Sequence, residues 1–150
     1  MTTRLSPASP IAGQIAVLEA PAPAGPDGKD GELIARTELV VAPTEPVFVG
    51  HYPDFPIFPG VCLIETVQLS ARAVVHPEAA LELAAVESAR FRGPVYPGDR
   101  VTVTMRWIPR GDEWVCSARL EVVSHLAAEV RLRYRSAVGE QAPHRRIEFF

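Results

Sequence analysis

The chain has 150 residues, a length that fits one domain able to bury a core without disulfides or metals. Hydrophobic residues make up 47% and charged residues 22%, which excludes disorder throughout. A net charge of −3 argues weakly against a general nucleic-acid binder. No run of about 20 apolar residues could cross a membrane, and the first residues lack the apolar stretch of a secretion signal. We expect one cytoplasmic domain over residues 1–150, with no nucleic acid or membrane as partner.

The N-terminal third alternates between strand-like and proline-rich stretches. Residues 1–10 resemble a loose arm, because Pro7 and Pro10 block regular structure. A short strand is expected over 11–19 and an exposed Pro/Gly-rich loop over 20–31. A second strand is expected over 32–42, where prolines end it, and the short apolar stretch 47–49 follows.

Residues 61–75 are predicted to form the main helix. Pro59 and Gly60 precede it, and His76-Pro77 ends it. The segment is apolar nearly all round, which predicts a buried helix. Its polar exceptions, Glu65, Gln68 and Arg72, follow a spacing that places them on one stripe.

The C-terminal half predicts antiparallel strands. Apolar and polar residues alternate over 101–107, 114–122 and 128–135, and short turns separate these runs. This pattern is typical of a meander with one face in water. A sheet of five or six strands wrapped around one helix is the simplest architecture, an α+β fold. Its open edges would be closed by pairing in a dimer.

One segment, Gly50 to Glu65, carries most of the functional information. His51 titrates near neutrality and can act as a base. Glu65 is a carboxyl group one turn inside an apolar helix, where burial would raise its pKa and let it act as an acid. The alternative for His51 is an ordinary loop residue. For Glu65 the alternative is a structural ion pair with Arg72 or a sheet arginine.

The start of the predicted helix offers a third chemical element. The first N–H groups of a helix have no helical partner and lie at the positive end of its dipole. At Gly60 and Val61 they could polarise a carbonyl oxygen, as in an oxyanion hole. Gly60 would also let a substrate approach the backbone closely. Gln68, Phe58 and Leu69 are candidates for orienting the acid or lining a tunnel.

The motif resembles the signature of the FabA/FabZ family of 3-hydroxyacyl-[acyl-carrier-protein] dehydratases. The match covers Gly50-His51-Tyr52-Pro53, Pro56-Ile57-Phe58-Pro59-Gly60-Val61 and Glu65, and a second block runs from Ala89 to Asp99. The resemblance extends from about Glu32 to Ser136. It implies a hotdog fold, in which an antiparallel sheet wraps a long helix, and a dimer in which His51 of one subunit meets Glu65 of the other.

The resemblance also implies the reaction and the partner. A 3-hydroxyacyl thioester on an acyl carrier protein would lose water to give the trans-2-enoyl thioester, in fatty-acid or polyene/polyketide synthesis. No cofactor is expected beyond the carrier's phosphopantetheine. Arg90, Arg92, Arg100, Arg106 and Arg110 are candidates for a carrier-docking patch, the alternative being a solvated sheet face.

The sequence departs from the family pattern at three places. Leu69 occupies the position of the usual Gln, and Gln68 lies one residue earlier. The N-terminal His-Arg-Tyr-Pro-Phe-type segment is replaced by a Pro/Ala-rich stretch, and Tyr52 replaces Phe. The altered Gln position and N-terminus leave room for a non-catalytic subunit of a heterodimeric dehydratase. A thioesterase on the same fold is the other alternative, against which the Gly-His-Tyr-Pro loop argues.

Two further expectations concern cysteines and metals. Cys62 and Cys116 form no close-spaced motif, so two buried free thiols are expected rather than a disulfide or a metal site. No set of histidines, cysteines and carboxylates shows metal-ligand spacing.

Overall fold

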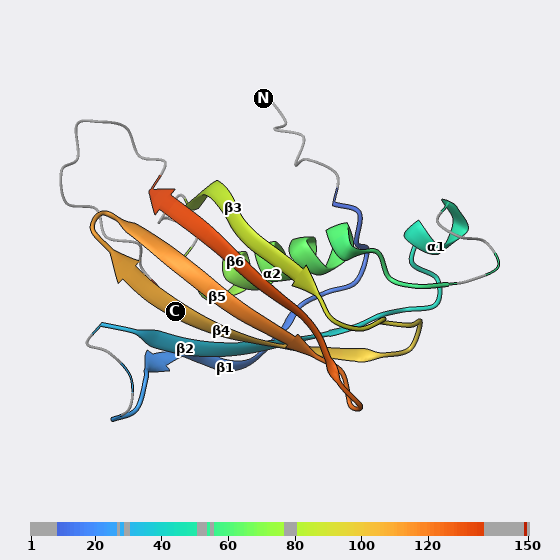
Figure 1. The fold of residues 1–150 in the computed structure, drawn as a ribbon, viewed down its shortest axis with the longest axis horizontal. Coiled ribbons are helices and arrows are strands. Elements are labelled where there is room, and N and C mark those ends of the chain that lie inside the picture. The colour runs from blue at the N-terminus through green and yellow to red at the C-terminus, as the bar shows by residue number, and fades with distance from the viewer. Residues whose placement is uncertain are drawn as a thin grey trace.

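The computed structural model describes residues 9–26, 28, 31–50, 54, 56–76, 81–136 and 149. In this part of the chain a six-stranded antiparallel sheet has the order β1-β2-β4-β5-β6-β3, and α2 lies along one side of it (Figure 1). The elements are β1 (Ala16–Pro23), β2 (Leu33–Val40), α1 (Val47–Gly50), α2 (Gly60–Val74), β3 (Leu81–Phe91), β4 (Arg100–Arg110), β5 (Glu113–Glu121) and β6 (Leu126–Ser136). The expected single helix against an antiparallel sheet is confirmed.

Helix α2 begins where the sequence predicts. Pro59 is its N-cap and has extended backbone angles. A proline is tolerated at this position because it has no N–H group that would need a partner. One face of α2 is buried against the sheet, through Cys62, Leu63, Thr66, Val67, Ser70, Ala71 and Val74. The opposite face, formed by Val61, Ile64, Glu65, Gln68, Leu69 and Arg72, is exposed or half-buried. The helix is therefore buried on one side in a single chain, rather than all round.

The predicted meander is confirmed as β4, β5 and β6. Its buried positions alternate with exposed ones, and residues such as Val103, Cys116 and Leu132 face α2 from neighbouring strands. The β4–β5 hairpin turns at Gly111, whose φ of 60° lies in the left-handed region that glycine adopts without strain. The buried face of these three strands supplies most of the core.

The first strand differs from its prediction. It runs from Ala16 to Pro23 and not over 11–19, so the loop expected from residue 20 begins later. Prolines fit here because β1 is an edge strand, paired only with β2, and its pairing shifts register on either side of Glu19. Edge positions and bulges are where a strand tolerates a residue that cannot donate a hydrogen bond.

Phe149, the last residue that the structure describes, packs back onto the core. Its ring lies 4.8 Å from that of Trp107 and 5.1 Å from that of Trp114, both edge-on. A β-bridge also joins Phe149 to Val75, at the end of α2. Phe149 therefore links the last turn of α2 to β4 and β5.

Neither a membrane-spanning helix nor a metal-binding cluster occurs among the described residues. No helix there is long and apolar enough to cross a membrane. No cluster of three or more histidine, cysteine or acidic side chains there could hold a metal ion.

Candidate active site

The candidate acid, Glu65, lies in the second turn of α2 on its partly open face. Its side chain is half-buried, and its Oε1 atom accepts a hydrogen bond from the Ser9 hydroxyl at 3.2 Å. Within the described chain, neither Arg72 nor any sheet arginine forms an ion pair with Glu65. The structural ion pair considered as its alternative role is thus not formed in this part of the molecule.

The candidate base, His51, lies outside the described residues, as do Tyr52, Pro53 and Phe55. Its approach to Glu65 therefore remains a prediction. The segments on either side of these residues are described. The single turn α1 ends at Gly50, one residue before His51, and the ring of Phe48 lies 6.1 Å from that of Phe58. This ring contact joins the segment that ends at Gly50 to the segment that leads into α2.

Phe58 lies in the core rather than at an open surface. Its side chain is 2% exposed, and its N–H donates to the carbonyl of Val95 at 2.7 Å. The bond ties the segment before α2 to the turn between β3 and β4. Phe58 thus fixes where the helix starts.

The N-terminus of α2 presents two amide groups. The N–H groups of Cys62 and Leu63 both donate to the carbonyl of Pro59, at 2.9 and 3.2 Å. Those of Gly60 and Val61 have no partner in the described part of the chain, and the Val61 side chain is 64% exposed. Backbone donors without a partner in their own chain are what an oxyanion hole requires.

Gly60 has a packing reason to be glycine. A Cβ atom there would lie 2.7 Å from Cζ of Phe91, closer than such atoms approach in proteins. The Phe91 ring of β3 thus covers the first residue of α2. The expectation that a substrate passes close to Gly60 remains a prediction.

Gln68 contacts the sheet instead of Glu65. Its Oε1 atom accepts a short hydrogen bond from the Tyr134 hydroxyl of β6. Burial is the main reason that the pKa of Tyr134 is raised; the nearby Cys116 and Glu65 raise it further, while Arg72 lowers it. The predicted contact of Gln68 with Glu65 is not formed among the described residues. Leu69, one position on, is half-buried and packs on the core.

Sequence reasoning missed Ser9, Glu45 and Tyr134. Tyr134 falls in the alternating run 128–135, and nothing in that pattern singles out its hydroxyl. Ser9 falls in the segment expected to be a loose arm. Glu45 stands between Pro43 and Pro46, where the prolines indicated only the end of a strand.

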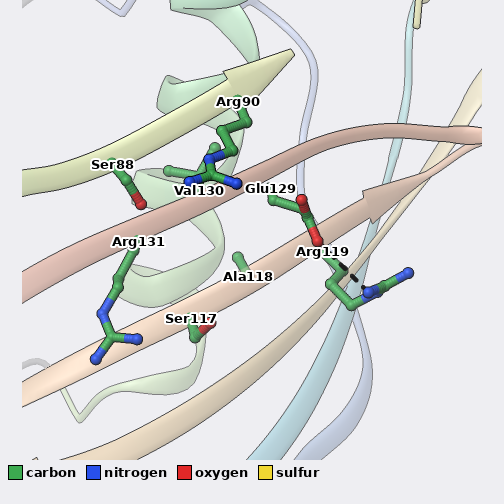
Figure 2. Close-up of a pocket in the computed structure, with 8 residues that line it drawn as sticks. All are labelled: Ser88, Arg90, Ser117, Ala118, Arg119, Glu129, Val130 and Arg131. Carbon is green, nitrogen blue, oxygen red and sulfur yellow. Dashed lines mark ion pairs between the residues drawn. The ribbon is translucent and has the colours of Figure 1, made fainter. Parts of the chain in front are cut away.

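The arginines considered as a docking patch are mostly neutralised. Arg92, Arg100, Arg106 and Arg110 form ion pairs with Glu129, Glu38, Glu32 and Glu87. Arg90 lines a shallow hollow formed by residues of β3, β5 and β6, in front of the strands and away from α2 (Figure 2). This hollow is on the opposite side of the sheet from Glu65. The arginines therefore resemble a solvated sheet face more than one continuous basic patch.

Comparisons with known proteins agree with this geometry. Residues 28–130 match the ApeI-like family, described as ApeI dehydratase. The chain is 38% identical over 106 residues to the 3-hydroxyacyl-[acyl-carrier-protein] dehydratase FabZ of Solibacter usitatus, covering 66% of this chain and 65% of that relative. It is 39% identical over 106 residues to FabZ of Rhizobium johnstonii, covering 67% and 68%. The matches thus span about two thirds of these relatives' length.

A solved structure resembles the fold as well. The dehydratase heterocomplex ApeI:P of Xenorhabdus doucetiae superimposes with a TM-score of 0.58 at 24% identity, covering 68% of this chain and 87% of that one. A six-stranded antiparallel sheet wrapped around one helix, together with this structural match, defines a hotdog-fold protein. The family match extends over more than half of the sequence. The chain belongs to the ApeI-like dehydratases, and the resemblance to the FabA/FabZ family is confirmed.

Proposed function

We propose that this protein dehydrates a 3-hydroxyacyl thioester held on an acyl carrier protein and releases the trans-2-enoyl thioester. The observation that carries the proposal is the placement of Glu65 on the same helix as the N–H groups of Gly60 and Val61, which have no partner among the described residues, in a chain of the ApeI-like dehydratase family. Those groups and one base are what the elimination requires.

In the proposed mechanism His51 removes the proton from the carbon next to the thioester carbonyl. The electron pair left behind spreads onto the thioester oxygen, where the N–H groups of Gly60 and Val61 stabilise the charge. Glu65 gives a proton to the 3-hydroxyl group as the carbon–oxygen bond breaks, and water leaves. The proton on His51 then returns to Glu65 through solvent. This sequence uses no metal or redox cofactor.

We infer that two chains share the site. In a single chain the α2 face that bears Glu65 also carries Val61, Ile64 and Leu69, apolar side chains that are not fully buried. Within the described sheet, β3 pairs only with β6, so its other edge is open to a second strand. A partner would cover both features. The partner is a second copy or, because the ApeI:P structure is a heterocomplex, a related subunit.

The carrier protein is the other proposed partner. A phosphopantetheine arm would bring the thioester to the mouth of the site, since the substrate is covalently bound to its carrier. The docking surface then lies near the N-terminus of α2 rather than around the Arg90 hollow, which is on the far side of the sheet.

Replacement of the acid and the base tests the proposal. His51→Ala and Glu65→Gln are expected to lower kcat by about 10²–10⁴, the usual contribution of a positioned acid or base. The measurement is absorbance of the enoyl thioester formed from carrier-bound 3-hydroxyacyl substrates of graded chain length. Glu121→Gln is the matched control for Glu65→Gln, because Glu121 is exposed on β5 and only pairs with Arg119 at 3.5 Å.

Unchanged rates in folded His51→Ala and Glu65→Gln variants would overturn this assignment. Release of free thiol from acyl thioesters, without enoyl product, would instead identify a thioesterase. A wild-type chain that is inactive until a homologous subunit is added would identify half of a heterodimeric dehydratase.

A further inference from the structure

A buried carboxylate lies close to the proposed site without taking part in the reaction. The side chain of Glu45, which stands just before α1, is only 2% exposed. Its Oε2 atom accepts from the N–H of Ala12 and its Oε1 atom from the N–H of Gly13, both at 2.8 Å. No arginine or lysine pairs with it in the described part of the chain. Two hydrogen bonds to a buried charge are strong and well directed, so they fix the backbone at residues 12 and 13.

Those residues belong to a segment that runs to Glu65. We call residues 9–13 the N-terminal strap. Ile11 anchors it in the core with 6% exposure, and the N–H of Ile11 donates to the Ser9 hydroxyl oxygen at 3.2 Å. The same hydroxyl group donates its hydrogen atom to Oε1 of Glu65 at 3.2 Å. Three successive backbone N–H groups, at residues 11 to 13, thus hold one serine against Glu65.

The strap leaves little room for variation. A Cβ atom at position 13 would lie 2.9 Å from Cδ1 of Leu39 and 3.1 Å from Oε1 of Glu45. Cys62 of α2 lies within electrostatic reach of both carboxylates: the pKa of its thiol is raised to about 11, mainly by burial and further by Glu45 and Glu65. Glu45, the strap and Glu65 therefore form one cluster around the first turns of α2.

We propose that Ser9 is a positioning residue for Glu65 and that Glu45 holds Ser9 in place through the strap. The inference rests on the proposed function, in which Glu65 is the proton donor. With Oε1 bound by Ser9, Oε2 is the oxygen atom left to carry the proton for the leaving hydroxyl. As the proton leaves, the carboxylate that forms is stabilised by the bond already present, so the contribution belongs to the transition state.

The first test removes only the Ser9 hydroxyl. Ser9→Ala is expected to lower kcat about 5- to 10-fold with KM changed less than about twofold, the pattern of an interaction made in the transition state. Ser9→Thr, which keeps a hydroxyl, is expected to retain kcat within about twofold of wild type. Ser124→Ala is the control, because this hydroxyl contacts the His125 ring in an exposed turn. Ser9 is exposed, so the folded state should be unaffected.

The second test concerns the anchor. Glu45→Gln is expected to lower kcat at least as much as Ser9→Ala, because an amide cannot accept from both N–H groups. The double variant should be no slower than Glu45→Gln alone, since both changes break one chain of contacts. Additive losses would show that Glu45 acts by another route, such as the His51 loop, and would overturn its role as anchor.

Glu65→Gln separates the two proposals. If Glu65→Gln is inactive while Ser9→Ala has wild-type kcat, or alters only KM, the positioning role is wrong and the dehydratase assignment stands. If Glu65→Gln retains full activity, the proposed function itself fails. If Glu45→Gln does not fold, the comparison of Ser9→Ala with Ser9→Thr still decides the role of Ser9.

Discussion

Single residues of the core have chemistry set by burial. Cys62 and Cys116 are both buried free thiols, as predicted, and burial raises the pKa of each. The thiolate is the reactive form of cysteine. The sulfur atoms of this protein are therefore shielded both by packing and by protonation.

The shielding predicts slow thiol labelling. At pH 7.5 the folded protein should react with a soluble thiol reagent at least about 100-fold more slowly than the protein unfolded in urea, because a rise of the Cys62 pKa from 9.0 to about 11 lowers the thiolate fraction by that factor. Labelling followed by mass spectrometry checks this. Equal rates in folded and unfolded protein would contradict it.

The same shifts predict loss of stability in alkali. A thiol whose pKa is raised in the folded state is stabilising below its unfolded value of 9.0, and that stability is lost as pH rises through about 11. The free energy of unfolding should thus fall between pH 9 and pH 11. Urea titrations at pH 8, 9, 10 and 11 measure it, and Cys62→Ala should fall less steeply than wild type. An equally steep fall in both proteins would exclude Cys62 as a cause.

Contacts between elements decide how α2 is held. The Thr37 hydroxyl of β2 donates to the Ser70 hydroxyl of α2 at 2.7 Å, and both side chains are fully buried. A second contact lies at the far end of the helix, where Phe149 forms a β-bridge with Val75 and packs its ring against Trp107 and Trp114. One is polar and one apolar, so they respond differently to mutation.

The polar contact predicts an asymmetry between single and double variants. Ser70→Ala should destabilise by about 1–3 kcal/mol, because the buried Thr37 hydroxyl loses its acceptor. Adding Thr37→Val should recover most of the loss, since no buried polar group is then left unpaired. Urea unfolding of both variants measures the difference. A double variant less stable than Ser70→Ala would contradict this account.

The packing of the Phe149 ring predicts that this side chain stabilises the folded state. Phe149→Ala should lower the free energy of unfolding by about 2–4 kcal/mol, because its ring packs edge-on against Trp107 and Trp114. Thermal unfolding followed by tryptophan fluorescence measures it. Phe149→Leu, which keeps an apolar side chain, is the control and should lose less; equal stability of Phe149→Ala and wild type would refute the contact.

At the same scale, the sequence patterns predicted which strands form more accurately than where those strands begin and end. The period of two in 101–107, 114–122 and 128–135 gave β4, β5 and β6, because one face of each strand is buried. The prolines in 20–31 indicated a loop, yet Pro21 and Pro23 lie in β1. Whether a strand is at an edge depends on its neighbours in space, and a local pattern does not contain them.

At the scale of the whole molecule, a shared site predicts rescue between two inactive variants. If His51 and Glu65 come from different subunits, mixing inactive His51→Ala and Glu65→Gln chains gives mixed dimers with one intact site. Random pairing then restores about a quarter of the wild-type activity. The enoyl absorbance assay after joint refolding measures this, with each variant alone as control. No rescue from dimers shown to mix would place both groups within one chain.

The sequence by itself determined the family, the wrapped helix and the identity of the candidate acid and base. These follow from local order, because a helix period, a strand period and the spacing from His51 to Glu65 are all written along the chain. Only the tertiary structure joined Ser9 to Glu65 and Tyr134 to Gln68. Those contacts connect residues 56 and 66 positions apart. Hydrogen bonds depend on positions in space, which the wrapping of the sheet around α2 sets and the residue order alone does not.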